Sequence, residues 1–205
     1  MLQTAQSALN QVVGIVQQMQ QLAYSSANSG TTDPAAMQAN QQEFTALQSD
    51  LNQISNTTKF GSQVLLAGGY TGTFQVGTGV SSYSQLAINI TTASTAAGLG
   101  LSSASVSVNT QSAATNAITA LSSALNTVDS IQAYLGAQQN QLTDIVSNLT
   151  VGQENLKASQ SSIVDTNFAQ ASTKLATQQI LEQTGASMLA QAQQAPQLVL
   201  KALGL

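Results

Sequence analysis

Seven apolar residues in the second half of the chain follow one another at intervals of seven without a gap. Residues at this spacing lie on one stripe of an α-helix, and such a stripe is buried only against other helices. The helix that carries them would be roughly 63 Å long over its heptads, at a rise of ~1.5 Å per residue. The seam consists of Leu121, Val128, Leu135, Leu142, Leu149, Leu156 and Ile163.

The first 56 residues predict two shorter helices. Between Leu2 and Ala23 apolar residues alternate at spacings of three and four, which is again a heptad seam. This helix is expected to end around Asn28-Ser29-Gly30, because Gly30 can take the left-handed cap conformation. Asp33 and Pro34 suit the N-cap and first position of a second helix. A short turn between two amphipathic helices predicts an antiparallel pair. The apolar face of the second helix would carry Met37, Phe44, Leu47, Leu51 and Ile54.

The middle of the chain changes to a period of two. Residues 72–76 and 85–90 alternate between apolar and polar types, and glycine-rich turns flank them, so short strands or a hairpin are expected. Val106 and Val108 suggest one more strand.

These patterns predict a mainly α chain, an elongated antiparallel helical bundle or coiled-coil rod with a small β-hairpin tip formed by the middle of the chain. We expect N-terminal rod helices over 1–56, a β-rich tip over 57–111 and a long C-terminal rod helix over 112–166. The first two helices are the available partners of the long seam. A further helix over 167–205 then has no evident partner, which indicates disorder or an interface with another chain.

Composition excludes several classes of function. Of 205 residues, only 4 are lysine, none is arginine and 8 are acidic, so the basic surface of a nucleic-acid-binding protein is missing. There is no histidine and no cysteine, which removes the usual zinc and haem ligands and most nucleophile–base pairs. No stretch approaches the ~18 consecutive apolar residues of a membrane span. Asp129, Asp144, Glu154 and Asp165 are too unevenly spaced to share a cation. We therefore expect no enzyme, cofactor, metal site or membrane insertion.

Four motifs, in the same order along the chain, resemble bacterial flagellin. The first lies in the first rod helix, the second in the turn after the second helix, the third in the C-terminal rod helix and the fourth at the start of the terminal polymerisation helix. The residues that carry the resemblance are 3–9 with 17–23 and 26–28, then 56–61, 134–142 and 180–197.

The chain departs from the family's pattern in two ways. Flagellins begin with a further helical segment that packs beside the C-terminal helix in the filament core, whereas Met1 falls inside the first rod helix. The resemblance therefore implies an N-terminally truncated chain, which accounts for the unpartnered helix after Phe168 and is expected to be impaired in assembly. The central region is also minimal, because the large outer domains of many flagellins are missing.

The resemblance implies a secreted, extracellular subunit of the bacterial flagellum that leaves the cell by type III export and self-assembles with other copies for motility. It implies no cofactor. Alternatives are a hook–filament junction protein, or a cell-surface polysaccharide-binding protein that would use Tyr70, Phe74 and Tyr83. A flagellar export chaperone is the other implied partner. The polymerisation and chaperone segment would include Ile180, Leu181, Met188, Leu189, Leu198 and Leu200.

Gln18, Leu22 and Glu43 match the positions through which many flagellins engage an innate immune receptor. In the family the first position is usually arginine, whose charged fork glutamine cannot replace. The resemblance thus implies weak or absent receptor activation. The alternative, which we favour, is that these are ordinary exposed helix residues.

Overall fold

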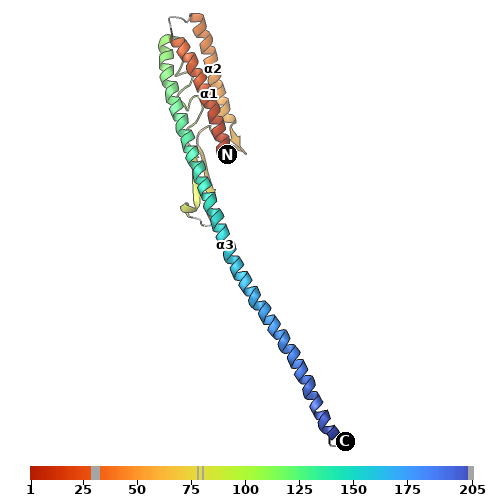
Figure 1. Cartoon of the computed structure of the whole chain (residues 1–205). Coiled ribbons are helices and arrows are strands. Elements are labelled where there is room, and N and C mark those ends of the chain that lie inside the picture. The colour runs from red at the N-terminus through yellow and green to blue at the C-terminus, as the bar shows by residue number, and fades with distance from the viewer. Residues whose placement is uncertain (29–32, 78, 80, 203–205) are drawn as a thin grey trace. The chain divides into compact units, whose positions relative to one another are not determined.

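The computed structural model describes residues 1–28, 33–77, 79 and 81–202 (Figure 1). Two long helices are followed by small strands and then by one very long helix. The prediction of a mainly α chain with small hairpins in its middle is confirmed. In chain order the elements are α1 (Leu2–Ala27), α2 (Pro34–Thr57), β1 (Lys59–Phe60), β2 (Gln63–Val64), β3 (Tyr70–Gln75), the 3₁₀ turn η1 (Ser82–Ser84), β4 (Gln85–Ile90) and α3 (Gln111–Ala202).

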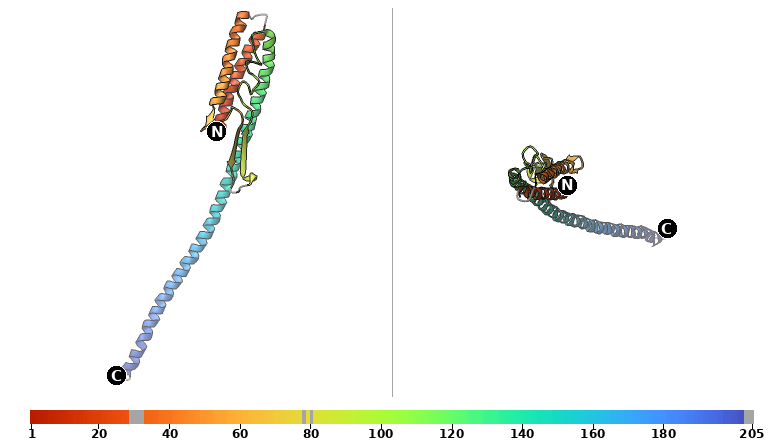
Figure 2. Two further views of the ribbon diagram at one scale, coloured as in Figure 1. Left: turned by 180° about the vertical axis from the view of Figure 1, so that it is seen from behind. Right: turned by 90° about the horizontal axis from the view of Figure 1, so that it is seen from above.

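The chain divides into two compact units, Met1–Ile145 and Val146–Leu205. In the first unit, α1 lies side by side with α2 and with the first part of α3 (Figure 2). Asn40 of α2 donates to the Ser26 hydroxyl, and Gln132 of α3 donates to Asn10. Near the start of α1, a shallow groove joins Leu2 to Leu142. Leu2 at the start of α1 thus lies beside Leu142, and Asn10, further along α1, contacts the earlier residue Gln132 of α3. The two helices are therefore antiparallel, as predicted.

The helix boundaries follow the sequence signals. Asp33 is the N-cap of α2 in extended conformation (φ −67°, ψ 147°), and Pro34 is the first helical residue, as expected. The Asp33 side chain makes no capping hydrogen bond. The end of α1 is capped at Asn28, close to the expected place; Gly30 lies outside the described residues.

One apolar core joins the three helices and the sheet of the first unit. The alternating seam of α1 is buried along its whole length, and Phe44 and Leu51 of α2 are fully buried. Because the helices cover one another, their polar faces remain outside. The fully buried large side chains of α1 and α2 are Leu9, Val12, Val16, Met19, Phe44 and Leu51.

The predicted hairpin over residues 72–76 and 85–90 is confirmed by β3 and β4, which pair antiparallel from Tyr70 opposite Ile90 to Gln75 opposite Gln85. Alternate β4 side chains enter the core, namely Leu86, Ile88 and Ile90. The hairpin is fixed to the helices at two points. The Tyr134 hydroxyl of α3 accepts a hydrogen bond from the Asn89 amide (3.1 Å), and the Tyr70 hydroxyl lies 3.0 Å from the Met1 sulfur.

The additional strand suggested by Val106 and Val108 is wrong. Both valines are buried, but residues 91–110 form no strand. Side chains of α2 make the hydrogen bonds that a neighbouring strand would otherwise provide, since buried backbone N–H and C=O groups need hydrogen-bond partners. Gln41 accepts a hydrogen bond from the Val108 amide (2.6 Å). Gln48 donates to the Leu101 carbonyl (2.7 Å), and Asn52 accepts one from the Ala96 amide (3.0 Å).

Replacing Gln48 by alanine should therefore destabilise the first unit. Gln48 is 4% exposed, and its loss leaves the buried Leu101 carbonyl without its donor. We expect Gln48→Ala to lower the free energy of unfolding by about 1–3 kcal/mol, measured by urea denaturation. Gln53→Ala, on the exposed face of the same helix, is the matched control and should stay within about 0.5 kcal/mol of the unsubstituted chain. Equal losses in both variants would contradict the role of Gln48.

The second unit contains the remaining length of α3. Every side chain that the structure describes in this unit is exposed. Among the described residues, no helix combines the length and hydropathy that crossing a membrane requires.

Candidate assembly site

The predicted seam of α3 is buried only in its first part. Leu121, Val128 and Leu135 have no exposed surface, and Leu142 is half-buried against the core. The length of α1 explains this limit. Its 26 residues reach about 39 Å at ~1.5 Å per residue, which cannot cover a seam of roughly 63 Å. In the first unit, the first residues of α1 lie beside Leu142, where the buried part of the seam ends.

The other part of the seam lies in the second unit and is exposed. Leu149, Leu156 and Ile163 expose 52%, 73% and 64% of their surface. Several large apolar side chains in regular succession on one helix are unusual for a surface that stays in water. The same heptad repeat therefore contributes to the core of the first unit and forms an exposed apolar stripe in the second unit.

The predicted polymerisation and chaperone segment continues this exposed apolar surface. Phe168 and Leu175 also expose more than half of their surface there. Of the six predicted residues, four are exposed, while the side chains of Leu198 and Leu200 lie outside the described residues. The four are Ile180, Leu181, Met188 and Leu189.

The three predicted receptor positions lie on α1 and α2 of the first unit. Gln18 and Glu43 are exposed, and Leu22 is half-buried against the core. Gln18 and Leu22 are one helical turn apart, so they share a face of α1.

The three aromatic residues proposed as a polysaccharide platform do not form one. Tyr70 and Phe74 are half-buried and pack against the core of the first unit. Only Tyr83, in η1, is open to solvent, with 96% of its surface exposed.

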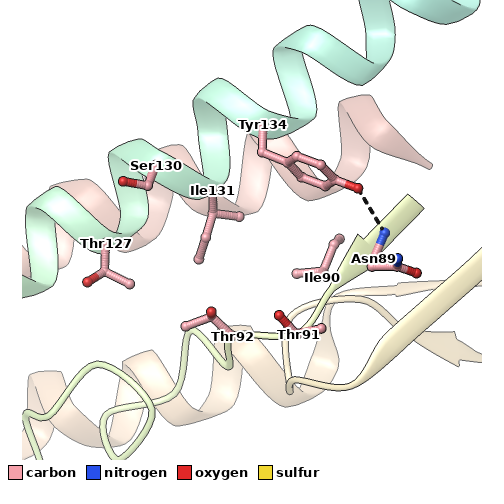
Figure 3. Close-up of a pocket in the computed structure, with 8 residues that line it drawn as sticks. All are labelled: Asn89, Ile90, Thr91, Thr92, Thr127, Ser130, Ile131 and Tyr134. Atoms are coloured by element: carbon pink, nitrogen blue, oxygen red, sulfur yellow. Dashed lines mark hydrogen bonds between the residues drawn. The ribbon is translucent and has the colours of Figure 1, made fainter. Parts of the chain in front are cut away.

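A groove lies between the end of β4 and α3, with a volume of about 550 Å³ (Figure 3). Ile90 and Ile131 face each other across it, and the Tyr134 ring closes one end through its hydrogen bond to Asn89. Hydroxyl groups form the rim, and none of the lining residues carries a charge. The rim residues are Thr91, Thr92, Thr127 and Ser130.

Acidic side chains provide no metal site in the part of the chain that the structure describes, where no three of them gather around one point. Asp129, Asp144 and Glu154 are all exposed on α3.

Sequence reasoning missed the groove and the polar contacts of α2. A signal for the latter was present, because Gln41, Gln48 and Ser55 recur every seven residues on the face that also carries Phe44 and Leu51. Polar residues on a buried face indicate backbone that needs hydrogen bonds. The Tyr134 contact with Asn89 had no such signal, since it joins residues 45 positions apart.

The sequence matches known families at both ends. Residues 1–71 match the bacterial flagellin N-terminal helical region, and residues 118–203 match the bacterial flagellin C-terminal helical region. The first match begins at residue 1 and does not confirm the expectation of a segment missing before Met1.

Curated relatives agree over nearly the whole chain. A flagellin of Halalkalibacterium halodurans is 34% identical over 203 residues, which cover 99% of this chain and 74% of the relative. A flagellin of Bacillus subtilis is 35% identical over 235 aligned positions, covering 99% of this chain and 76% of the relative.

Solved structures share the fold. The crystal structure of Bacillus cereus flagellin superposes with a TM-score of 0.62 at 20% identity and covers 72% of this chain and 82% of the other. The structure of FliC from Burkholderia pseudomallei gives a TM-score of 0.61 at 20% identity, with coverages of 68% and 97%.

Proposed function

Because the chain belongs to the bacterial flagellin family, and so is a structural, non-enzymatic subunit of the extracellular flagellar filament, we propose that its uncovered α3 stripe is where copies meet. Members of this family polymerise with one another and serve motility. The residues assigned to this contact lie in the second unit. They are Leu149, Leu156 and Ile163, followed by the apolar residues of 167–205.

The exposed part of the seam is the observation that carries this proposal. A heptad stripe is stable in water when a second helix covers it, and the chain covers only the part over 121–142. A helix from another copy supplies the missing cover. The contact joins different surfaces of two copies, and such contacts repeat into an open helical polymer if they do not close into a ring.

Electron microscopy of the purified full chain, with sedimentation to quantify polymer, tests the assignment. Regular filaments are expected; the sequence-based expectation of impaired assembly depended on a truncation that the match beginning at residue 1 does not confirm. A chain that stays monomeric at every concentration, with its helices intact by circular dichroism, would argue against assembly through this stripe.

We further propose that a flagellar export chaperone covers the segment around Met188 and Leu189 before type III export. Both side chains are exposed, and an amphipathic helix that lies in an apolar groove is a common form of peptide recognition. Isothermal titration of the chain with a purified chaperone of this class tests the proposal. Binding that Met188→Asp leaves unchanged would contradict it.

For the innate receptor, we propose weak activation because Gln18 is neutral. Arginine there would offer a charged, bidentate donor on the exposed face of α1. We expect Gln18→Arg to increase receptor signalling by about tenfold, since a charged hydrogen bond contributes roughly 1.5–3 kcal/mol. A reporter-cell assay measures this, with the exposed neighbour variant Gln17→Arg as control. Strong and equal signalling by the unsubstituted chain and both variants would contradict the proposal.

A further inference from the structure

Tyr83 is the most exposed large apolar side chain among the described residues, at 96% of its surface. The large apolar side chains of β3 and β4 pack in or against the core of the first unit, namely Tyr70, Phe74, Leu86, Ile88 and Ile90. Tyrosine combines a large apolar ring with a hydroxyl, and this combination is enriched where proteins meet.

Hydrogen bonds are formed by the residues on either side of Tyr83. The Gln75 side-chain nitrogen Nε2 donates to the carbonyls of Gly77 (2.7 Å) and Gly79 (2.6 Å). The Val76 amide donates to Ser84 (2.8 Å), and the Ser84 amide donates to Ser81 (2.9 Å).

The groove beside β4 has the size and chemistry to take this ring. Its volume is about 550 Å³, and Ile90 and Ile131 provide apolar walls (Figure 3). Its rim of threonine and serine hydroxyls can hydrogen-bond a phenol, and no charged residue lines it.

Tyr83 cannot fill the groove of its own copy. Tyr83 lies in η1, before the start of β4, and the groove lies at the other end of that strand. The strand from Gln85 to Asn89 alone spans about 13 Å at ~3.3 Å per residue. We propose that in the polymer Tyr83 of one copy inserts into the groove beside β4 of a neighbouring copy. This contact uses two different patches of the first unit, as an open polymer requires. It rests on the polymerisation of the chain but is separate from the α3 stripe.

The lowest protein concentration at which polymer forms, the polymerisation threshold, is measured for substitutions in each half of the contact, Tyr83 and the groove. We expect Tyr83→Ala and Ser130→Trp each to raise it about tenfold or more, because an anchoring aromatic in a pocket is typically worth more than a tenfold change in affinity. Ser122→Trp is the matched control. Both serines lie exposed on α3 and donate to the carbonyl four residues before, so the substitutions differ only in reaching the groove.

Cross-linking gives an independent result. The chain has no cysteine, so Tyr83→Cys and Ser130→Cys introduce the only thiols when the two single variants are mixed with excess unsubstituted chain. A short bis-maleimide should link the two variants in polymer but not in monomer, and Ser122→Cys in place of Ser130→Cys should give no link. Polymer without the Tyr83–Ser130 link, at unchanged thresholds, would overturn the contact and leave the filament assignment standing. Failure of the unsubstituted chain to polymerise would overturn both.

Discussion

Leu135→Ala should lower the free energy of unfolding of the first unit by about 2–5 kcal/mol, whereas Leu156→Ala should change it by less than about 0.5 kcal/mol. The two leucines occupy the same seam of the same helix, three heptads apart. Leu135 is fully buried and Leu156 is 73% exposed. Truncating Leu135 leaves a cavity beside α1, whereas truncating Leu156 only reduces the apolar surface that is exposed to water.

Tyrosine fluorescence during urea denaturation is the suitable measurement. The chain has no tryptophan, and its four tyrosines, Tyr24, Tyr70, Tyr83 and Tyr134, all lie in the first unit. The signal therefore reports on that unit alone. A similar, large loss of stability in both variants would mean that the seam is covered along its whole length in the single chain.

Sequence periodicity could predict the helices because burial on one face of a helix has a clear signature. The seam of α1, the first part of the α3 seam and the alternation of β4 are buried as the periodicity predicts, whereas Leu149, Leu156 and Ile163 of the α3 seam are exposed. The motif resemblance also pointed to the correct family, since it depends on specific residues in a fixed order and not on composition.

The heptad pattern could not predict at which residue the α3 seam stops being buried. Leu135 and Leu156 look identical in the repeat, yet Leu135 is fully buried and Leu156 is 73% exposed. A heptad pattern says that a stripe is buried in some state, but it does not say whether the partner is the same chain.

The middle of the chain was predicted less well for a different physical reason. Residues 91–110 carry buried valines, which resemble a strand in sequence, yet their backbone pairs with side chains of α2. Such pairing depends on residues more than 40 positions away, such as Gln48 with Leu101, and leaves no local pattern. The groove beside β4 is of the same kind, because it forms only where α3 and the hairpin meet.

Two charges placed on the uncovered stripe should abolish polymerisation. We expect Leu149→Asp combined with Leu156→Asp to raise the polymerisation threshold by more than about a hundredfold. Burying one leucine is worth about 1.5–3 kcal/mol, and each 1.4 kcal/mol is tenfold in affinity, before the cost of burying carboxylates is added. Tyrosine-monitored stability of the first unit should not change, because both leucines lie outside it and are exposed.

The control for this variant separates loss of apolar contact from simple charge repulsion. Asn148→Asp with Asn155→Asp adds the same two charges, at the same spacing and one position earlier on α3, and keeps the size of each side chain. Both asparagines are exposed, and a shift of one residue turns a side chain by about 100° around the helix, away from the stripe. If repulsion between copies were decisive, both double variants would fail to polymerise and high salt would restore both, since salt screens exposed charges. If the stripe is the contact surface, only the leucine variant fails and salt does not restore it. Equal polymerisation by both variants would show that copies meet elsewhere.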